Sequence, residues 1–174
     1  MGQRNKRHFV PETYKVEERL KAETGFNWIW YKNSYYFSDQ GGVYNQDNDK
    51  FLKPQLNFDK NGKPDYSTIQ LCYNGKSQKK DIHSIIAELF CKKYLYADKP
   101  KLLVHHINHN KADNRAVNLI WLTHKQHRLV HNAPPEEVDT KDKIKTYLDI
   151  CGFPLSLKGG TTRYIAQIVI VDKE

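Results

Sequence analysis

The segment LLVHHINHNKADNRAVNLIWLTHKQHRLVH, residues 102–131, holds six of the eight histidines in the chain. Its two short apolar runs, LLVHH and NLIWL, are typical of β-strands, and a polar loop over residues 107–117 joins them. The next run, THKQHRLVHN, begins with Thr123 and Gln126 at the spacing of a capping box, and Pro134 follows it as a helix stop. The segment therefore predicts a strand, a long loop, a second strand and a helix.

The histidines of this segment fall into different groups once the elements are assigned. Neighbouring residues on a strand point to opposite faces, so His105 and His106 are expected to serve different roles. On the helix, His127 and His131 are four positions apart and share a face. If the helix packs across the strands, His105 and His127 can converge on one divalent ion, with His131 as a further candidate. Neutral imidazole is a good ligand for zinc, nickel or manganese, whereas magnesium prefers oxygen.

The composition points to a polyanionic partner. The chain has 174 residues, which fits one domain or two small ones, and its net charge of +8 favours nucleic acid as the partner. The sequence has no apolar run of about eighteen residues and no apolar stretch after its basic start, so neither a membrane span nor an export signal is expected. Its three cysteines form no CxxC pair, which excludes the usual paired-cysteine zinc knuckle.

The rest of the chain alternates helical and strand-like texture. A helix is expected over residues 11–23, an antiparallel sheet of three or four strands over 28–73 with hairpin turns at Asn61 and Asn74, and a helix over 82–95. After the histidine-rich segment, a helix over 136–151 and a strand over 162–171 are expected. This organisation divides the chain into four parts. They are an N-terminal helical segment (1–27), a β-rich DNA-binding region that ends in a helix (28–100), the histidine-rich module (101–133) and a helix-strand extension (134–174).

The stretch VHHINHNKADNRAVNLIWLTHKQH, residues 104–127, resembles the HNH (ββα-metal) nuclease motif of phage and intron homing endonucleases. The resemblance implies that His105 and His127 are metal ligands and that His106 is the general base. It also implies that Asn118, opening the second strand, braces the site. The twelve positions from His106 to Asn118 and the nine from Asn118 to His127 match that subgroup without an insertion. The implied fold is α+β: an N-terminal antiparallel sheet with a helix, then the ββα-metal motif and a small αβ extension.

The chain departs from the family pattern at two places. Many relatives carry Asp-Gly where this chain has Asn108 and His109. Relatives also differ at the first ligand, and His105 in place of Asp makes a softer site. The cofactor expected is one divalent ion, Mg²⁺ or Mn²⁺ first, with Zn²⁺ or Ni²⁺ as alternatives.

Other histidines receive different expectations. His131 matches a third ligand in the bacteriocin-type branch of the superfamily, and its role stays open between ligand, phosphate contact and helix-end residue. His109 and His124 are expected to be exposed. His83 is expected to pack near the start of its helix, outside the site.

Basic residues supply the expected DNA contacts. Arg115 and Lys111 lie in the loop between the two motif strands, and Arg115 is the better phosphate clamp because its guanidinium is bidentate. Lysines in or beside turns of the sheet can meet phosphates if a β-ribbon enters the major groove: Lys76, Lys79 and Lys80. The expected partner is double-stranded DNA, bound by a monomer or homodimer in the cytoplasm of a bacterial or phage-infected cell.

The function expected is a metal-dependent DNA endonuclease of the homing type. Two alternatives remain: a restriction-type or general phage HNH nuclease, and a non-catalytic DNA-binding protein that keeps the fold. His106 argues against the last alternative, because a binding module does not need a histidine beside a metal ligand.

Overall fold

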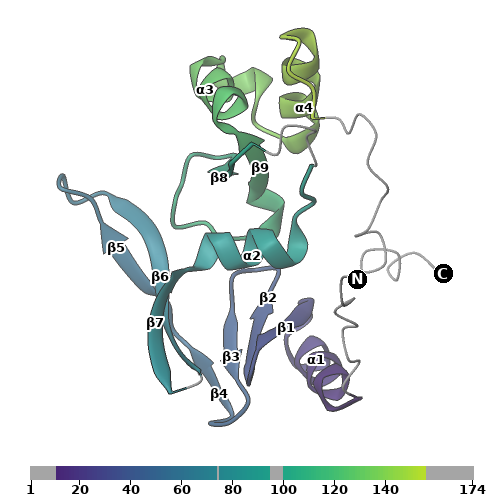
Figure 1. Cartoon of the computed structure of the whole chain (residues 1–174), viewed down its shortest axis with the longest axis vertical. Helices are drawn as coiled ribbons and strands as arrows, with labels where there is room; N and C mark the ends of the chain where they lie inside the picture. The colour runs from purple at the N-terminus through teal and green to yellow at the C-terminus, as the bar shows by residue number, and fades with distance from the viewer. Residues whose placement is uncertain (1–10, 74, 95–99, 156–174) are drawn as a thin grey trace, which may run out of the picture.

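The computed structural model describes residues 11–73, 75–94 and 100–155 of the chain. Helices and antiparallel strands are mixed along it, which confirms the α+β class (Figure 1). The elements are α1 (Pro11–Thr24), β1 (Trp28–Lys32), β2 (Tyr35–Ser38), β3 (Val43–Asn45), β4 (Lys50–Leu52), β5 (Gln55–Phe58), β6 (Pro64–Tyr73), β7 (Lys76–Asp81), α2 (Ile82–Phe90), β8 (Leu102–His106), β9 (Leu119–Thr123), α3 (His124–Asn132) and α4 (Lys141–Ile150), with short 3₁₀ turns η1 (Ala116–Asn118) and η2 (Pro135–Glu137).

The N-terminal region contains two sheets rather than the single sheet of three or four strands that the sequence predicted. Strands β1 to β4 form one antiparallel sheet, and β5 to β7 form a second one. The chain leaves the first sheet at Lys53 and Pro54, between β4 and β5. Proline has no N–H to give to a sheet ladder, so a break in pairing at this position is favourable.

The expected hairpin turns both connect strands of the second sheet. The turn around Asn61 joins β5 to β6, and a turn at Gly75, where φ is +68°, joins β6 to β7. Glycine adopts this left-handed conformation without steric cost. The β5–β6 hairpin projects from the body of the molecule, at the left of the view in Figure 1.

Helix α2 lies at the centre of the molecule, between the sheets and the histidine-rich module (Figure 1). Ile82, Ile85 and Ile86 are buried in a core that also contains residues of both sheets and, from the module, Ala116 and Leu119. The burial of this apolar face fixes the module relative to the sheets, because burying such side chains stabilises by about 1.5–3 kcal/mol each.

Helix α2 ends at Phe90, five residues before the predicted end at residue 95. Cys91 has an extended backbone, and its thiol lies 3.4 Å from the carbonyl oxygens of Ala116 and Leu119. Lys93 then places its ammonium over the ring of Trp121. These contacts with the module compete with further helical turns, so the local helical pattern overestimates the length of α2.

The histidine-rich module has the predicted order of strand, loop, strand and helix. Strands β8 and β9 pair antiparallel, and α3 begins after Thr123 with both hydrogen bonds of the capping box present. Helices α3 and α4 pack together over a second core that includes Ile120, Val130 and Ile144. The expected final strand over residues 162–171 lies outside the described residues, and the four-part division of the chain stays a prediction. No helix in the described ranges is long and apolar enough to cross a membrane.

Candidate functional site

Strand β8 directs its two terminal histidines to opposite sides. His105 pairs with Ile120 and His106 pairs with Leu119 in the ladder with β9. Both rings are buried, at 2% and 5% exposure. The ring of His105 contacts the histidines of α3, whereas the ring of His106 contacts residues of β6 and α2. The alternation of a strand therefore separates the two imidazoles into different environments.

The first environment is a group of imidazoles around His105. Its ring centroid lies 5.1 Å from that of His127 and 4.9 Å from that of His131. One nitrogen from each of these three residues can be chosen so that all three atoms lie within 4.8 Å of one another. Nε2 of His105 is buried and has no hydrogen-bond partner among the described residues. A buried polar atom without a partner is costly, and a metal ion would satisfy it.

Helix α3 holds its two histidines in place through its N-terminus. The Thr123 hydroxyl accepts from the Gln126 backbone N–H, and the Gln126 side chain accepts from the Thr123 N–H. The Gln126 amide also donates to the backbone oxygens of Phe153 and Pro154, after α4. Because His127 follows Gln126 directly, these bonds fix the helical turn that carries the first imidazole of α3.

The imidazoles of this group are neutral at neutral pH. Burial, followed by the neighbouring histidines, lowers the pKa of His105 to about 3. Burial also lowers the pKa values of His127 and His131. Neutral imidazole offers the lone pair that a metal requires. The donor set and the orphaned nitrogen of His105 therefore fit a divalent ion.

The second environment surrounds His106. Its Nε2 lies 3.5 Å from Oδ1 of Asn114, in the loop between β8 and β9. Its ring centroid is 5.3 Å from that of His83 on α2 and 5.8 Å from that of Tyr66 on β6. Burial is the main reason why the pKa of His106 is lowered, and Asn114 opposes that shift. A neutral His106 can accept a proton.

Asn118 braces the loop between the motif strands. It is the last residue of η1 rather than the first of β9, one position earlier than predicted. Its side-chain oxygen accepts from the Asn108 backbone N–H, and its Nδ2 donates to Asn108 Oδ1 and to the Asp113 carbonyl oxygen, each at 2.9 Å. Its own carbonyl oxygen accepts from the N–H of Ile107, the residue after His106.

The two basic residues of the loop already have acidic partners. The Arg115 guanidinium binds both oxygens of Asp113, at 2.8 and 2.6 Å, and holds the pKa of that carboxyl at about 2. Lys111 pairs with Asp65 at 2.9 Å and lies 4.7 Å from the centre of the Tyr66 ring. Both residues follow His106 within ten positions of the sequence, and the side chain of each is about half exposed.

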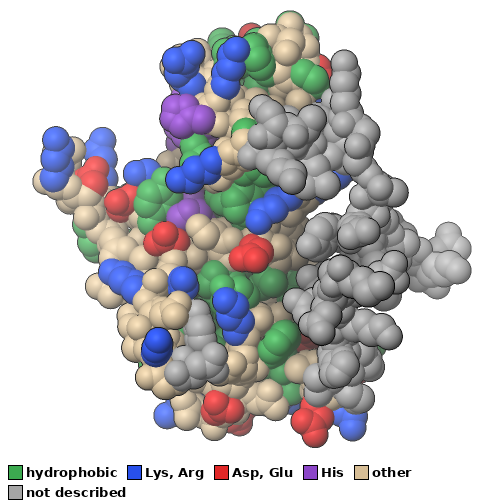
Figure 2. Space-filling view, viewed as in Figure 1, with side chains coloured by type: hydrophobic (Ala, Val, Ile, Leu, Met, Phe, Trp, Pro, Cys, Tyr) green, Lys and Arg blue, Asp and Glu red, His purple; other side chains and the backbone are tan. Residues whose placement is uncertain are grey.

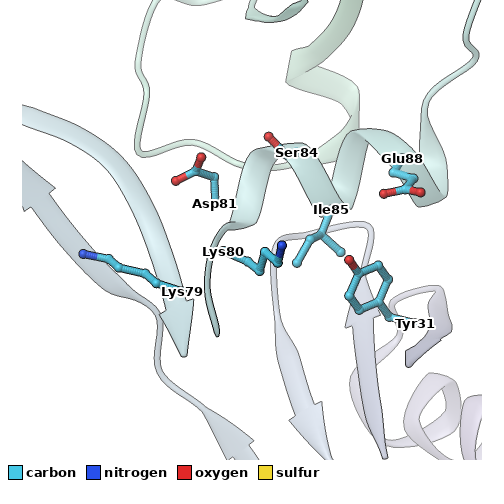
Figure 3. Close-up of a pocket in the computed structure, with 7 residues that line it drawn as sticks. All are labelled: Tyr31, Lys79, Lys80, Asp81, Ser84, Ile85 and Glu88. Carbon is cyan, nitrogen blue, oxygen red and sulfur yellow. The ribbon is translucent and has the colours of Figure 1, made fainter. Parts of the chain in front are cut away.

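The three lysines of β7 lie on a different part of the surface. Lys76 and Lys79 are exposed and Lys80 is half-buried. Lys79 and Lys80 contribute to a cavity of about 380 Å³ beside α2, whose other lining residues are Tyr31, Asp81, Ser84, Ile85 and Glu88. Figure 3 shows Lys80 directed into this cavity and Lys79 directed away from it. The cavity contains none of the histidines of either environment.

The space-filling view shows where these groups reach the surface. Histidine side chains are visible on the upper part of the molecule, and lysine and arginine side chains lie above and below them and at the tip of the projecting hairpin (Figure 2). His109 and His124 are exposed, as expected. His109 nevertheless contacts the metal-side imidazoles, at 5.3 Å from His105 and 5.0 Å from His131 between ring centroids.

The sequence pattern did not place three side chains that lie near the histidines. Asn114 and Tyr66 carry no pattern that would have singled them out. His83 offered a weak signal, because it is the one histidine on a mostly apolar helix, IHSIIAELF. It packs at the start of α2 as expected, but it also lies against His106.

Comparison with known proteins matches the histidine-rich module to a nuclease family. The family model of HNH endonucleases matches residues 97–129. The DNA endonuclease I-HmuI of Bacillus phage SP01 is 34% identical over 95 residues, which cover 55% of this chain and 49% of that protein. An uncharacterised HNH endonuclease of Acanthamoeba polyphaga mimivirus is 28% identical over 116 residues, which cover 66% of this chain and 30% of that protein.

A solved structure of the HNH homing endonuclease I-HmuI, described for DNA binding and cleavage, aligns with 74% of this chain and 65% of its own, at 29% identity and a TM-score of 0.47. Residues 97–129 therefore match the HNH endonuclease family, and the chain is similar to a phage homing endonuclease. These matches confirm the resemblance expected from residues 104–127. The chain spans between about a third and a half of the length of the curated relatives that it matches.

Proposed function

We propose that the chain is a divalent-metal-dependent DNA endonuclease of the homing type, which hydrolyses phosphodiester bonds. The observation that carries this proposal is the separation of His105 and His106 on the two faces of β8. One imidazole lies in a group of potential metal ligands, and its neighbour is buried, neutral and free of that group. A metal site beside an independent proton acceptor is the arrangement that hydrolysis of a phosphodiester needs.

His105 and His127 would hold the ion, with His131 as the third ligand. The ion would supply positive charge to the scissile phosphate and to the leaving 3′ oxygen. Three imidazoles without a carboxylate favour a borderline metal over a hard one. We therefore place Zn²⁺ and Ni²⁺ beside Mn²⁺, and ahead of Mg²⁺, as the metals to test.

His106 is the proposed general base. If its Nε2–H donates to Asn114 Oδ1, the lone pair of Nδ1 is free to take a proton from the attacking water. The water oxygen then bonds to phosphorus while the bond from phosphorus to the 3′ oxygen breaks. The leaving 3′ oxygen takes a proton from solvent, so the products are a 5′ phosphate and a 3′ hydroxyl. Asn118 acts at a distance, since its hydrogen bonds hold the loop that follows His106.

Double-stranded DNA is the proposed partner. The net charge of +8 and the exposed lysines at the tip of the β5–β6 hairpin, Lys60 and Lys63, suit a phosphate backbone. Phe58, on the same hairpin, is 62% exposed and offers an apolar contact for a groove. To contact DNA, Lys111 and Arg115 would have to exchange their carboxylate partners for phosphates. The high density of negative charge on DNA favours this exchange. A monomer with one site would nick, whereas a homodimer could cut both strands.

A plasmid cleavage assay tests this function. Supercoiled DNA is incubated with the full chain and Mg²⁺, Mn²⁺, Ni²⁺ or Zn²⁺, and nicked and linear products are quantified. We expect metal-dependent cleavage that falls by about 10²- to 10⁴-fold in His106→Ala, the usual contribution of a general base. His124→Ala, an exposed histidine on α3, is the matched control and should cut normally.

Unchanged cleavage by His106→Ala would remove the proposed mechanism. DNA binding without cleavage under any of the four metals would instead assign the chain to the non-catalytic alternative. Footprinting separates the remaining pair of functions, because a homing enzyme protects a long site and a restriction-type or general nuclease protects a short one or none.

A further inference from the structure

His109 occupies a backbone position that suits glycine better than histidine. Its φ is +58°, in the left-handed region, and its backbone N–H donates to the His106 carbonyl oxygen at 3.0 Å. Side chains with a Cβ rarely adopt this conformation, because Cβ approaches the following carbonyl oxygen. A residue held in such a conformation raises the question of what its side chain does.

The side chain of His109 reaches the metal-side imidazoles from the loop. Its ring centroid is 5.3 Å from that of His105 and 5.0 Å from that of His131. These distances are close to the 5.1 Å between His105 and His127, two of the proposed ligands. Helix α3 supplies two of the three imidazoles in the group, whereas His109 comes from the loop that follows β8.

We propose that His109 is a fourth nitrogen ligand of the ion held by His105, His127 and His131. It is an exchangeable ligand: it binds when no DNA is present and gives up its position to a phosphate oxygen of the substrate. This inference rests on the metal site of the proposed function and adds to it a ligand that depends on substrate.

The exposure of His109 makes such an exchange feasible. Its ligand atom lies outside the group of three that come within 4.8 Å of one another, so binding requires a rotation of the side chain. His109 is exposed, so its side chain borders solvent, into which it can turn. The three other imidazoles are held by β8 and α3, which makes His109 the ligand that leaves most easily.

Four imidazoles define a class of metal. A tetrahedral set of nitrogen ligands suits Zn²⁺ and Co²⁺, while Mg²⁺ demands oxygen and octahedral geometry. In the free protein the site would be closed, as structural zinc sites are, and DNA would open it.

The test compares His109→Gly with the wild-type full chain and with His124→Ala. Glycine accepts a φ of +58°, so the metal-free thermal midpoint of His109→Gly should be equal to or above that of the wild type. The Zn²⁺ affinity, measured by calorimetry without DNA, should fall by about 10- to 100-fold. Loss of a residue that only hydrogen-bonds to a metal ligand already lowers metal affinity by that much. The visible Co²⁺ absorption should lose intensity as coordination moves away from four nitrogens. His124→Ala should match the wild type in all three measurements.

Equal Zn²⁺ affinity and equal Co²⁺ spectra in His109→Gly and wild type would overturn the inference. A lower metal-free midpoint together with weaker binding would also overturn it, because His109 would then act through the fold. If the wild type bound neither Zn²⁺ nor Co²⁺, the proposed metal site would fail as well. Metal binding that is strong and independent of His109 would remove this inference alone and leave the proposed nuclease intact.

Discussion

The two faces of β8 obtain their partners from different parts of the chain. On the His105 face, the neighbouring imidazoles His127 and His131 come from α3, within the same short module. On the His106 face, Tyr66 and His83 come from β6 and α2, in the region before the module. The candidate metal site is therefore local, whereas the environment of the proposed base depends on how the module packs against the sheets.

This difference determines how each face should respond to mutation. Changes in α3 should affect metal binding and leave the surroundings of His106 in place. Changes in β6 or α2 should affect His106 without altering the metal site. Asn118 lies between the two faces, because it holds the loop that joins β8 to β9, and it should affect both.

Asn118→Ala should have the largest effect on stability. It removes three hydrogen bonds from a buried side chain and leaves the Asn108 N–H and the Asp113 carbonyl without partners. The cost should be about 2–4 kcal/mol in the free energy of unfolding, measured by urea titration. Asn118→Asp is the informative control, since it keeps the acceptor for the Asn108 N–H and loses the two donated bonds. A loss below about 0.5 kcal/mol would show that the loop does not depend on Asn118.

Acid should destabilise the His106 face through His83. Burial lowers the pKa of His83 to about 4, from an ordinary value of 6.5. Between these two pH values the unfolded chain binds a proton that folded His83 does not bind, so stability rises with pH across the window and is lost as pH falls. A difference of this size corresponds to on the order of 3 kcal/mol.

The variant His83→Phe keeps a ring against Tyr66 and His106 and removes the titration. Urea unfolding of metal-free protein at pH 7 and pH 4.5 should show a smaller acid loss in the variant than in the wild type. The remaining loss belongs to the other buried histidines, His105 above all. Identical losses in the two proteins would show that His83 is not responsible.

Asn114→Ala should slow cleavage by roughly tenfold and leave metal affinity unchanged. The side-chain oxygen lies 3.5 Å from His106 Nε2, a long contact, so a modest loss of orientation is expected rather than loss of the base. Steady-state cleavage and Zn²⁺ calorimetry on the same preparation separate the two effects. A fall in Zn²⁺ affinity comparable to the fall in rate would mean that the two faces of β8 are not independent.

Arg115→Ala should have the smallest effect. The guanidinium is already bound by both oxygens of Asp113 at an exposed position. A DNA phosphate would therefore have to compete with Asp113 for Arg115. We expect DNA affinity to fall less than about tenfold, and the salt dependence of binding to lose at most about one phosphate contact. A much larger loss, seen by filter binding over a salt series, would restore Arg115 as the main phosphate clamp.

The sequence predicted the local features of the site and missed the distant ones. Strand alternation separated His105 from His106, the spacing of His127 and His131 placed them on one helical face, and Thr123 with Gln126 marked the start of α3. Each of these rules acts within a few residues, so the sequence alone contains the information.

The missed features depend on tertiary packing. Tyr66 lies forty residues before His106, and no periodic pattern joins them. The early end of α2 has the same origin, because the Cys91 thiol turns toward carbonyl groups of the module. The pairing of Lys111 with Asp65 likewise connects the loop to β6 and could not be anticipated from the loop alone.

The central claim is that two adjacent histidines perform separate tasks. It is tested most directly by measuring Zn²⁺ affinity and plasmid cleavage for His105→Ala and His106→Ala side by side. We predict that His106→Ala binds the metal as the wild type does but cuts DNA about 10²- to 10⁴-fold more slowly, and that His105→Ala neither binds nor cuts. Loss of metal affinity in His106→Ala, or normal cleavage by either variant, would contradict the account.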